Sequence, residues 1–168
     1  MTITASAAIF ARERNLFPLS PSPWHTTGMV SGTTISHCHK SGHELSSALL
    51  AATGAVEAFA GAAELDRVTA RRLAIIVEEV VANILDHAAH DRDIAFTLSL
   101  HHGESGPLVT LEDDSDPFDP RTVASAEAPN PDRGGGVGLA LVAAWADILS
   151  YGSAGGRNRL VLQQRLTG

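Results

Sequence analysis

The feature that most constrains the fold is a long amphipathic segment, residues 66–89, in which apolar side chains recur at three- and four-residue steps. With about 3.6 residues per turn, this spacing gathers the apolar side chains on one side of a helix. That side must pack against other elements to leave water. The segment therefore predicts a helix that begins at Asp66 or Thr69 and buries Leu73, Ile76, Val77, Val80 and Ile84.

The same helix carries a polar stripe, because Glu79, Asn83 and His87 follow one another at four-residue steps. Such spacing stacks the three side chains on nearly one face. A polar group that faces a core must find a partner or lose about 1–3 kcal/mol. Glutamate and asparagine on a helix most often form only its solvated face, so the stripe alone indicates no particular ligand.

Strand and helix patterns alternate along the first two thirds of the chain. Three segments are rich in β-forming residues or alternate apolar and polar side chains, and these predict strands at residues 33–40, 93–102 and 106–113. A Gly-Glu-Ser-Gly turn between the last two favours a hairpin. Residues 41–44 have the Ser-x-x-Glu form of a capping box, and the helical stripe of residues 45–63 follows it.

The last third of the chain predicts a loop, a helix and a second hairpin. Residues 114–133 are polar with four prolines, residues 136–149 have the pattern of a helix, and two strands follow at residues 148–153 and 158–166. Helices grouped beside such strands predict an α+β fold. We expect a two-layer α/β sandwich, in which a mixed, mostly antiparallel sheet is covered by helices on one face.

The domain organisation follows from a change in composition near residue 32. The stretch before it contains "FPLSPSPW", whose three prolines exclude a regular helix or a central strand. We expect residues 1–32 to form a partly ordered extension, which packs either on the domain or on a second chain. Residues 33–168 are long enough for one domain with a core of its own.

Charge and composition exclude several classes of function. A net charge of −7 disfavours direct binding to nucleic acid or to an anionic membrane. Lys40 is the only lysine and does not lie in a P-loop motif, which excludes a P-loop NTPase. The single cysteine, Cys38, fits a reducing compartment, and the best apolar run, residues 48–63, is too short to span a membrane. The sequence therefore predicts a cytoplasmic protein.

Two further polar clusters interrupt the hydrophobic pattern. The acidic stretch "EDDSDPFDP", residues 112–120, follows a strand, and "DRGGGVGLALV", residues 132–142, precedes a helix. Glycines before a helix let backbone N–H groups approach a phosphate at the positive end of the helix dipole, although a flexible hinge is an equally simple reading. The glycine spacing differs from Gly-x-Gly-x-x-Gly, and no strand precedes it, so a Rossmann site is excluded.

Taken in order, the three clusters resemble the nucleotide-binding boxes of the histidine-kinase-like ATPase superfamily, which has the GHKL or Bergerat fold. "EVVAN" is similar to its Glu-x-x-x-Asn box, "DDSDPF" to its Asp-x-Gly box and "GGGVGLALV" to its glycine box. Within that superfamily, residues 33–166 resemble the small anti-sigma-factor serine/threonine kinases. The resemblance also rests on "GGRNRLVL" near the C-terminus.

The resemblance implies a site for ATP and Mg²⁺ and gives its residues their roles. Asn83 would ligate Mg²⁺, Glu79 would act as the catalytic base, and Asp113 would accept a hydrogen bond from the adenine amino group. The remaining nucleotide-binding residues would be Ser115, Gly134, Gly136, Val137, Gly138 and Leu139.

Some positions keep more than one interpretation. Ser115 stands where the family has glycine, which permits the backbone to come close to the base, so the nucleotide affinity is open. His87 is either part of the site or a structural histidine, and either Arg133 or Arg121 is a candidate for contact with phosphate. A zinc site in "SHCHKSGH" is disfavoured, because on a strand Cys38 would point away from its neighbours His37 and His39.

The resemblance implies an ATP-dependent protein serine/threonine kinase. Such a protein binds a sigma factor, phosphorylates an anti-anti-sigma partner of the STAS type and can form a homodimer. The alternative is a non-catalytic, nucleotide-sensing module that sequesters a sigma factor or another partner. A third alternative is slow ATP hydrolysis without a protein acceptor.

Overall fold

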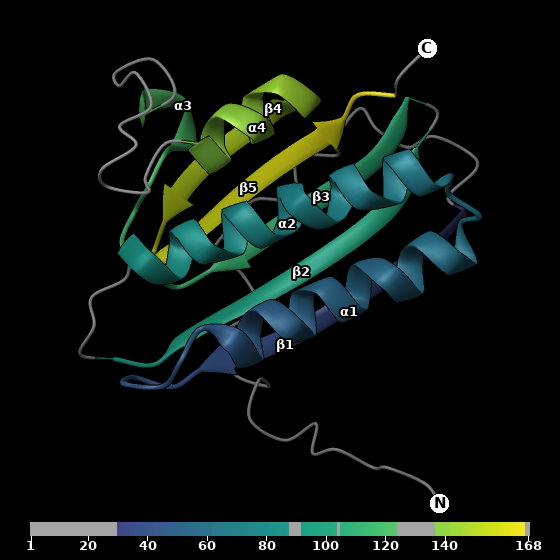
Figure 1. The fold of residues 1–168 in the computed structure, drawn as a ribbon. Coiled ribbons are helices and arrows are strands. Elements are labelled where there is room, and N and C mark those ends of the chain that lie inside the picture. The colour runs from purple at the N-terminus through teal and green to yellow at the C-terminus, as the bar shows by residue number, and fades with distance from the viewer. Residues whose placement is uncertain (1–29, 88–91, 104, 124–136, 167–168) are drawn as a thin grey trace, which may run out of the picture.

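The described residues form one open five-stranded sheet with helices along one of its faces (Figure 1). The computed structural model describes residues 30–87, 92–103, 105–123 and 137–166. The strands are β1 (Val30–His39), β2 (Ile94–Gly103), β3 (Gly106–Asp113), β4 (Ala146–Ala154) and β5 (Arg157–Gln164). The helices are α1 (Ser46–Ala62), α2 (Arg67–His87), α3 (Pro120–Val123) and α4 (Val137–Trp145).

The sheet order is β1-β2-β3-β5-β4, and each neighbouring pair is antiparallel. The predicted order of elements and the predicted α+β sandwich are confirmed. The central strand β3 lies between β2 and β5, so the end of β3 is opposite the start of β5. This register pairs Asp113 with Asn158, two positions that are 45 residues apart in sequence.

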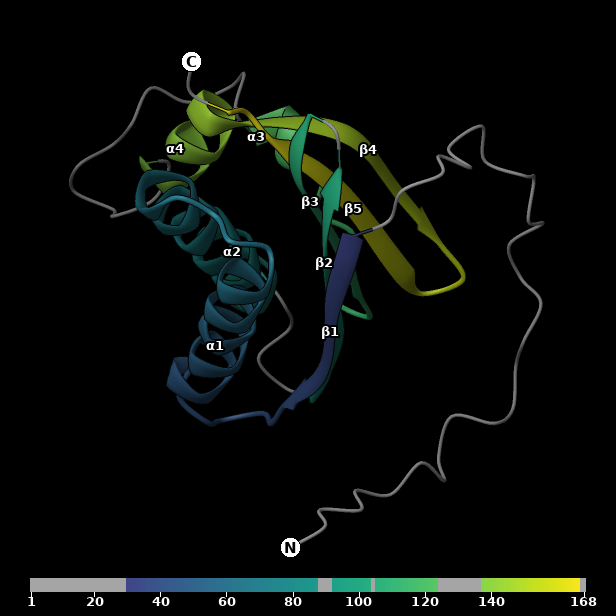
Figure 2. The same ribbon diagram turned by 90° about the vertical axis from the view of Figure 1, so that its right-hand side faces the viewer.

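Helices α1, α2 and α4 all lie on the same side of the sheet (Figure 2). The predicted apolar side of α2 is buried against it: Leu73, Ile76 and Val77 are fully inaccessible to solvent. Alternate residues of β2, among them Phe96 and Leu98, meet these side chains from the sheet. The core therefore lies between one helical layer and one face of the sheet.

Helix α2 begins where the sequence predicts, because Asp66 caps it. The carboxylate of Asp66 accepts hydrogen bonds from the backbone amides of Val68 at 2.8 Å and Thr69 at 3.1 Å. These amides belong to the first turn of the helix and have no partner within it. Hydrogen bonds from Thr69, first through its side chain and then its backbone, lower the pKa of Asp66.

The predicted capping box at the start of α1 is wrong. The helix begins at Ser46, with Leu45 at the capping position and no side-chain hydrogen bond there. The backbone amide of Ser41 instead donates to Asp93 at 3.0 Å, and Lys40 pairs with the same carboxylate. Residues 40–45 are thus held as a turn by the start of the following hairpin, and the helix starts after that turn.

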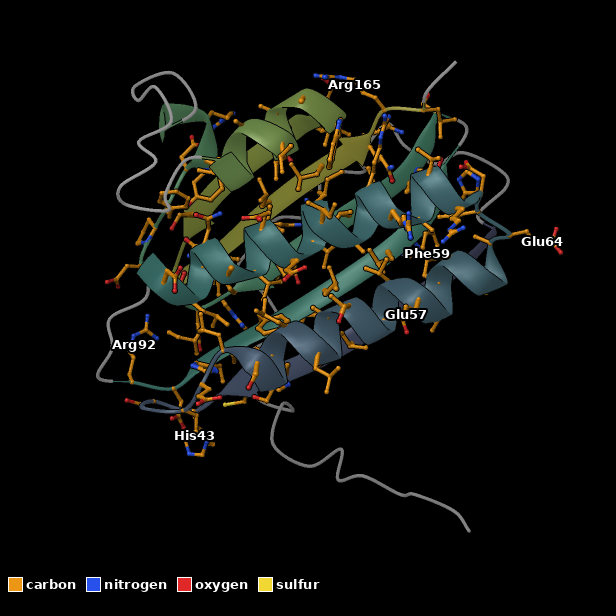
Figure 3. The ribbon with its side chains drawn as sticks, in the orientation of Figure 1. His43, Glu57, Phe59, Glu64, Arg92 and Arg165 are labelled. Carbon is orange, nitrogen blue, oxygen red and sulfur yellow. The ribbon has the colours of Figure 1, made fainter. Side chains whose placement is uncertain are left out.

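The predicted helix over residues 136–149 is too long, because α4 ends at Trp145. Arg165, labelled in Figure 3, caps the C-terminal end of α4. The Nη1 atom of Arg165 donates to the carbonyl oxygens of Ala143 and Ala144, and its backbone amide donates to the carbonyl oxygen of Trp145. Strand β4 starts immediately afterwards, where Ala146 pairs with Gln164 of β5. Pairing with the last strand therefore takes over residues whose local pattern is helical.

The predicted loop over residues 114–133 contains the short helix α3, and residues 124–133 lie outside the described part of the chain. Of the predicted N-terminal extension, residues 1–29 also lie outside it, and β1 begins at Val30. None of the helices in the described residues is long and apolar enough to cross a membrane.

Candidate functional site

A pocket opens between α2, α4 and the ends of the central strands. Its walls are apolar on the helix side, where Val80 and Ile84 of α2 and Leu139 of α4 contribute, and polar where β3 and β5 meet. The polar lining consists of Asn83, Asp113, Ser115, Tyr151 and Asn158. A pocket with one apolar wall and a few convergent polar groups is typical of a small-molecule site.

Asp113 is a buried carboxylate in the lining of this pocket. Strand β3 ends with this residue, whose side chain is only 3 % exposed. Its Oδ1 atom accepts hydrogen bonds from the Ser115 backbone amide at 2.9 Å, the Ser115 hydroxyl at 2.5 Å and the Asn158 amide at 2.9 Å. These bonds from described residues all go to one carboxylate oxygen, so Oδ2 can accept a donor from a ligand.

Ser115 lines the pocket, and its hydroxyl is hydrogen-bonded to neighbouring protein atoms. Its hydroxyl lies between Asp113 and the backbone oxygen of Asp116, at 2.5 and 3.2 Å, and the residue is 6 % exposed. The serine that departs from the family pattern is thus a partner of the carboxylate. Its extra hydrogen bond stabilises the orientation of Asp113.

Asn158 and Tyr151 complete the polar lining of the pocket, and neither was predicted from the sequence. The side-chain amide of Asn158 donates to Asp113 and to the backbone oxygen of Ser115, each at 2.9 Å. The hydroxyl of Tyr151 donates to the Oδ1 atom of Asn158 at 3.4 Å. The alternation of β5 held a signal, because Asn158 falls on the same face as Leu160 and is therefore polar at a core position. Tyr151 had no comparable signal.

Asn83 lines the same pocket from α2, with its amide oriented by the helix. Its Nδ2 atom donates to the backbone oxygen of Glu79, one turn earlier, at 2.6 Å. Because the nitrogen is used in this way, Oδ1 is directed away from the helix backbone. An amide oxygen is among the ligands that Mg²⁺ accepts alongside phosphate oxygens. The chemistry of this group fits the predicted metal ligand, which stays a prediction.

Glu79 lies one turn before Asn83 and packs against the first turn of α4. A Cβ atom added to Gly138 would overlap the Glu79 carboxylate, so the two residues are in direct contact. Burial, and then the charge of Glu78, raises the pKa of Glu79. A carboxylate with a raised pKa is a better proton acceptor than an exposed one, which suits a general base.

The structure brings some of the predicted residues together and leaves others undescribed. Asn83, Asp113, Ser115 and Leu139 line one pocket, and Glu79 contacts Gly138 beside it. Val137 is the first residue of α4 and His87 the last of α2, but their side chains lie outside the described part. The residues Gly134, Gly136 and Arg133 are outside it altogether.

Arg121, a candidate for phosphate contact, lies in α3 and pairs with Asp119. Its Nη2 atom is 2.6 Å from the Asp119 carboxylate, and its Nε atom donates to the same group. Hydrogen bonding to Arg121 lowers the pKa of Asp119. In this structure the guanidinium is therefore bound to a carboxylate of its own loop.

The alternative zinc site lacks the necessary geometry. Strand β1 exposes Cys38 and buries its neighbour His39, as alternation along a strand requires. Within the described residues, no three His, Cys, Asp or Glu side chains converge in a way that could hold a metal ion. A magnesium site made of Asn83 and nucleotide phosphates would not need such a cluster.

The family model of the histidine kinase-like ATPase domain matches residues 44–164. Among solved structures, a chain of the SiaB–SiaC complex from Pseudomonas aeruginosa is similar over 77 % of this chain and 89 % of that chain, with 17 % sequence identity and a TM-score of 0.47. No curated protein matches in sequence.

Proposed function

The chain belongs to the histidine kinase-like ATPase family, and on that premise we propose that it is an ATP-dependent protein serine/threonine kinase that works with Mg²⁺. The observation that carries this proposal is the single pocket that Asn83 and Asp113 share. It combines a buried carboxylate acceptor with an oriented amide oxygen. These are the two groups that an adenine base and a metal-bound phosphate chain require.

At the polar end of the pocket, Asp113 would recognise the base. Its Oδ2 atom would accept a hydrogen bond from the adenine amino group, while Ser115 and Asn158 hold Oδ1. A guanine presents a carbonyl oxygen at that position, which would face the carboxylate without a proton between them. The apolar side chains of Val80, Ile84 and other residues of the pocket would pack on the base.

On helix α2, Asn83 and Glu79 would act at the phosphates. When bound, Mg²⁺ would neutralise phosphate charge, and Asn83 Oδ1 is the protein atom suited to ligate it. Glu79 would take the proton from the attacking serine or threonine hydroxyl. The hydroxyl oxygen then bonds to the γ-phosphorus, the bond to the β,γ-bridging oxygen breaks, and ADP leaves with that oxygen.

For partners, we propose a sigma factor and an anti-anti-sigma protein of the STAS type as the phosphate acceptor. The proposal rests on the similarity of the three boxes and the C-terminal segment to the anti-sigma-factor kinases. The net charge of −7 supports protein partners over direct binding to nucleic acid.

A second candidate function is a nucleotide-sensing module without catalysis, and Ser115 is the observation that favours it. Serine in place of glycine adds a side chain next to the predicted base site. Slow ATP hydrolysis without an acceptor is the third outcome that an experiment must separate.

Calorimetry with Mg-ATP, followed by a transfer assay, separates these functions. Binding of Mg-ATP without comparable binding of Mg-GTP is expected, and no heat at millimolar nucleotide would exclude the kinase. Next, the immobilised protein with Mg-ATP captures its partners, and γ-labelled ATP is added. Label on a serine or threonine of a captured protein supports the kinase. Binding without label supports the sensing module, and release of free phosphate without an acceptor supports hydrolysis.

A further inference from the structure

Two of the contacts between helices α2 and α4 are separated by seven residues on each helix. At the C-terminal end of α4, the Arg72 guanidinium lies over the Trp145 ring, 5.4 Å from its centroid. In the first turn of α4, Gly138 packs against Glu79. Seven residues are two helical turns, so both contacts fall on the same face of each helix and the helices run antiparallel. Figure 1 shows the two helices side by side.

The contact at Gly138 depends on the absence of a side chain. The three heavy atoms nearest to an added Cβ would be Oε2, Cδ and Oε1 of Glu79, and the overlap is too close for the carboxylate to stay in place. Helix α4 has little freedom to move away, since Trp145 stacks with Arg72 and Arg165 binds the carbonyl oxygens at its end. The flexible carboxylate of Glu79 would therefore be the group that moves.

We propose that Gly138 is a positioning residue for Glu79: its missing side chain makes the space in which the carboxylate of the general base is held. This proposal rests on the kinase function proposed above for the role of Glu79, but the contact itself does not. It gives this glycine of the glycine box a task distinct from letting backbone amides approach a phosphate.

Gly138→Ala is the direct test, with Gly54→Ala as its matched control. Gly54 lies within α1, and an added Cβ would meet no atom within 4 Å there. For Gly138→Ala we expect Mg-ATP affinity within about threefold of the parent and phosphoryl transfer slower by about 10²-fold, the typical cost of displacing a catalytic group by 1 Å. Gly54→Ala is expected to keep both values.

A double-mutant cycle with Glu79→Ala decides between the two tasks of the glycine. If Gly138 makes space for the carboxylate, Gly138→Ala destabilises the parent more than it destabilises the Glu79→Ala variant, as thermal unfolding measures. If Gly138→Ala weakens Mg-ATP binding equally in both backgrounds, the glycine serves the phosphates and the proposal is overturned. The double variant lacks the overlap, so it is expected to fold even if the single variant does not.

A measurement without nucleotide keeps this test independent of the kinase proposal. The carboxyl carbon of Glu79 can be observed by NMR in the full chain at one fixed pH. In Gly138→Ala the displaced carboxylate is expected to change its chemical shift, and an unchanged shift would overturn the proposed contact. If the parent transfers no phosphate at all, the proposed function fails while this measurement still judges the position of Glu79.

Discussion

The side-chain amide of Asn158 donates a hydrogen bond of 2.9 Å to Asp113 across the adjacent strands β5 and β3. Both residues are buried, and the same amide also binds the backbone of Ser115. This arrangement fixes the one carboxylate in the pocket from two strands at once. The orientation of Asp113 is therefore a property of the sheet register as much as of the Asp-x-Gly segment.

Asn158→Ala should weaken nucleotide binding although Asn158 is in none of the three predicted boxes. Loss of a hydrogen bond to a charged group costs about 1.5–3 kcal/mol and leaves Asp113 free to rotate. We expect the Kd for Mg-ATP to rise by at least about tenfold, together with a lower Tm. Gln163→Ala, on the opposite face of β5, is the control, and equal losses in both variants would contradict the assignment.

Ser115→Gly restores the residue of the family pattern and tests what the serine does. Because its hydroxyl binds Asp113, we expect the variant to be less stable, by about 1 kcal/mol, without a gain in affinity for Mg-ATP. Thermal unfolding and calorimetry give the two numbers. A tenfold gain in affinity would mean that the serine obstructs the base, which would favour the sensing module.

Glu79→Gln should abolish phosphoryl transfer and retain Mg-ATP, since glutamine cannot accept the proton. The raised pKa of Glu79 also predicts that the Glu79→Gln variant is more stable than the parent at neutral pH. The folded state favours the neutral acid, so the parent loses stability as the pH rises from the ordinary value of 4.5 through the raised pKa. Glu79→Gln should therefore have a higher Tm than the parent at pH 7 but not below pH 4.5.

The control for this substitution is Glu57→Gln, on the exposed side of α1. It should change neither the transfer rate nor the difference in Tm between the two pH values. Unchanged transfer in Glu79→Gln would remove Glu79 from the role of base.

Asn83→Ala should remove the dependence of nucleotide binding on magnesium. In the parent, EDTA is expected to weaken ATP binding, because the metal links the phosphates to Asn83 Oδ1. In the variant, ATP should bind with the weaker affinity whether or not EDTA is present. Calorimetry in the two buffers measures this, and an equal effect of EDTA on parent and variant would argue for another ligand.

The lowered pKa of His37 predicts that the protein loses stability in mildly acidic solution. Burial, followed by the charge of His39, lowers the pKa of His37 from its ordinary value of 6.5. The unfolded chain then binds the proton more readily, so stability is lost as the pH falls from 6.5 to the lowered pKa. His37→Gln should flatten the dependence of Tm on pH in this window, whereas the exposed His43→Gln should leave it as in the parent.

Local patterns were sufficient for the elements whose neighbours agree with them. The apolar stripe of α2 predicted both the helix and its buried side, and strand β3 has the predicted bounds of residues 106–113. Antiparallel pairing of consecutive strands and a helical layer then follow from the order of the elements. Here the sequence pattern and the tertiary structure favour the same conformation.

Where the prediction from the sequence failed, the local structure is determined by residues that are distant in the chain. Helix α4 ends at Trp145 because Arg165 binds its last carbonyl oxygens, and no helix breaker in the local sequence marks that end. The turn before α1 is held by Asp93, about fifty residues later. In the site, the boxes pointed to Asp113 and Asn83, but Asn158 could join them only through the pairing of β5 with β3.

The binding of Arg165 to α4 has a consequence for the order in which the site assembles during synthesis. A nascent chain that has reached residue 123 already contains Asn83 and Asp113, but it lacks Asn158 and the cap of the helix that carries Gly138. Strand β4 has β5 as its one partner among the described strands, so it too must wait. A ribosome-bound intermediate of this kind would hold half of the pocket on a nearly complete core. Competence to bind a nucleotide would then arise late, when residues 157–165 add the last strand and close α4.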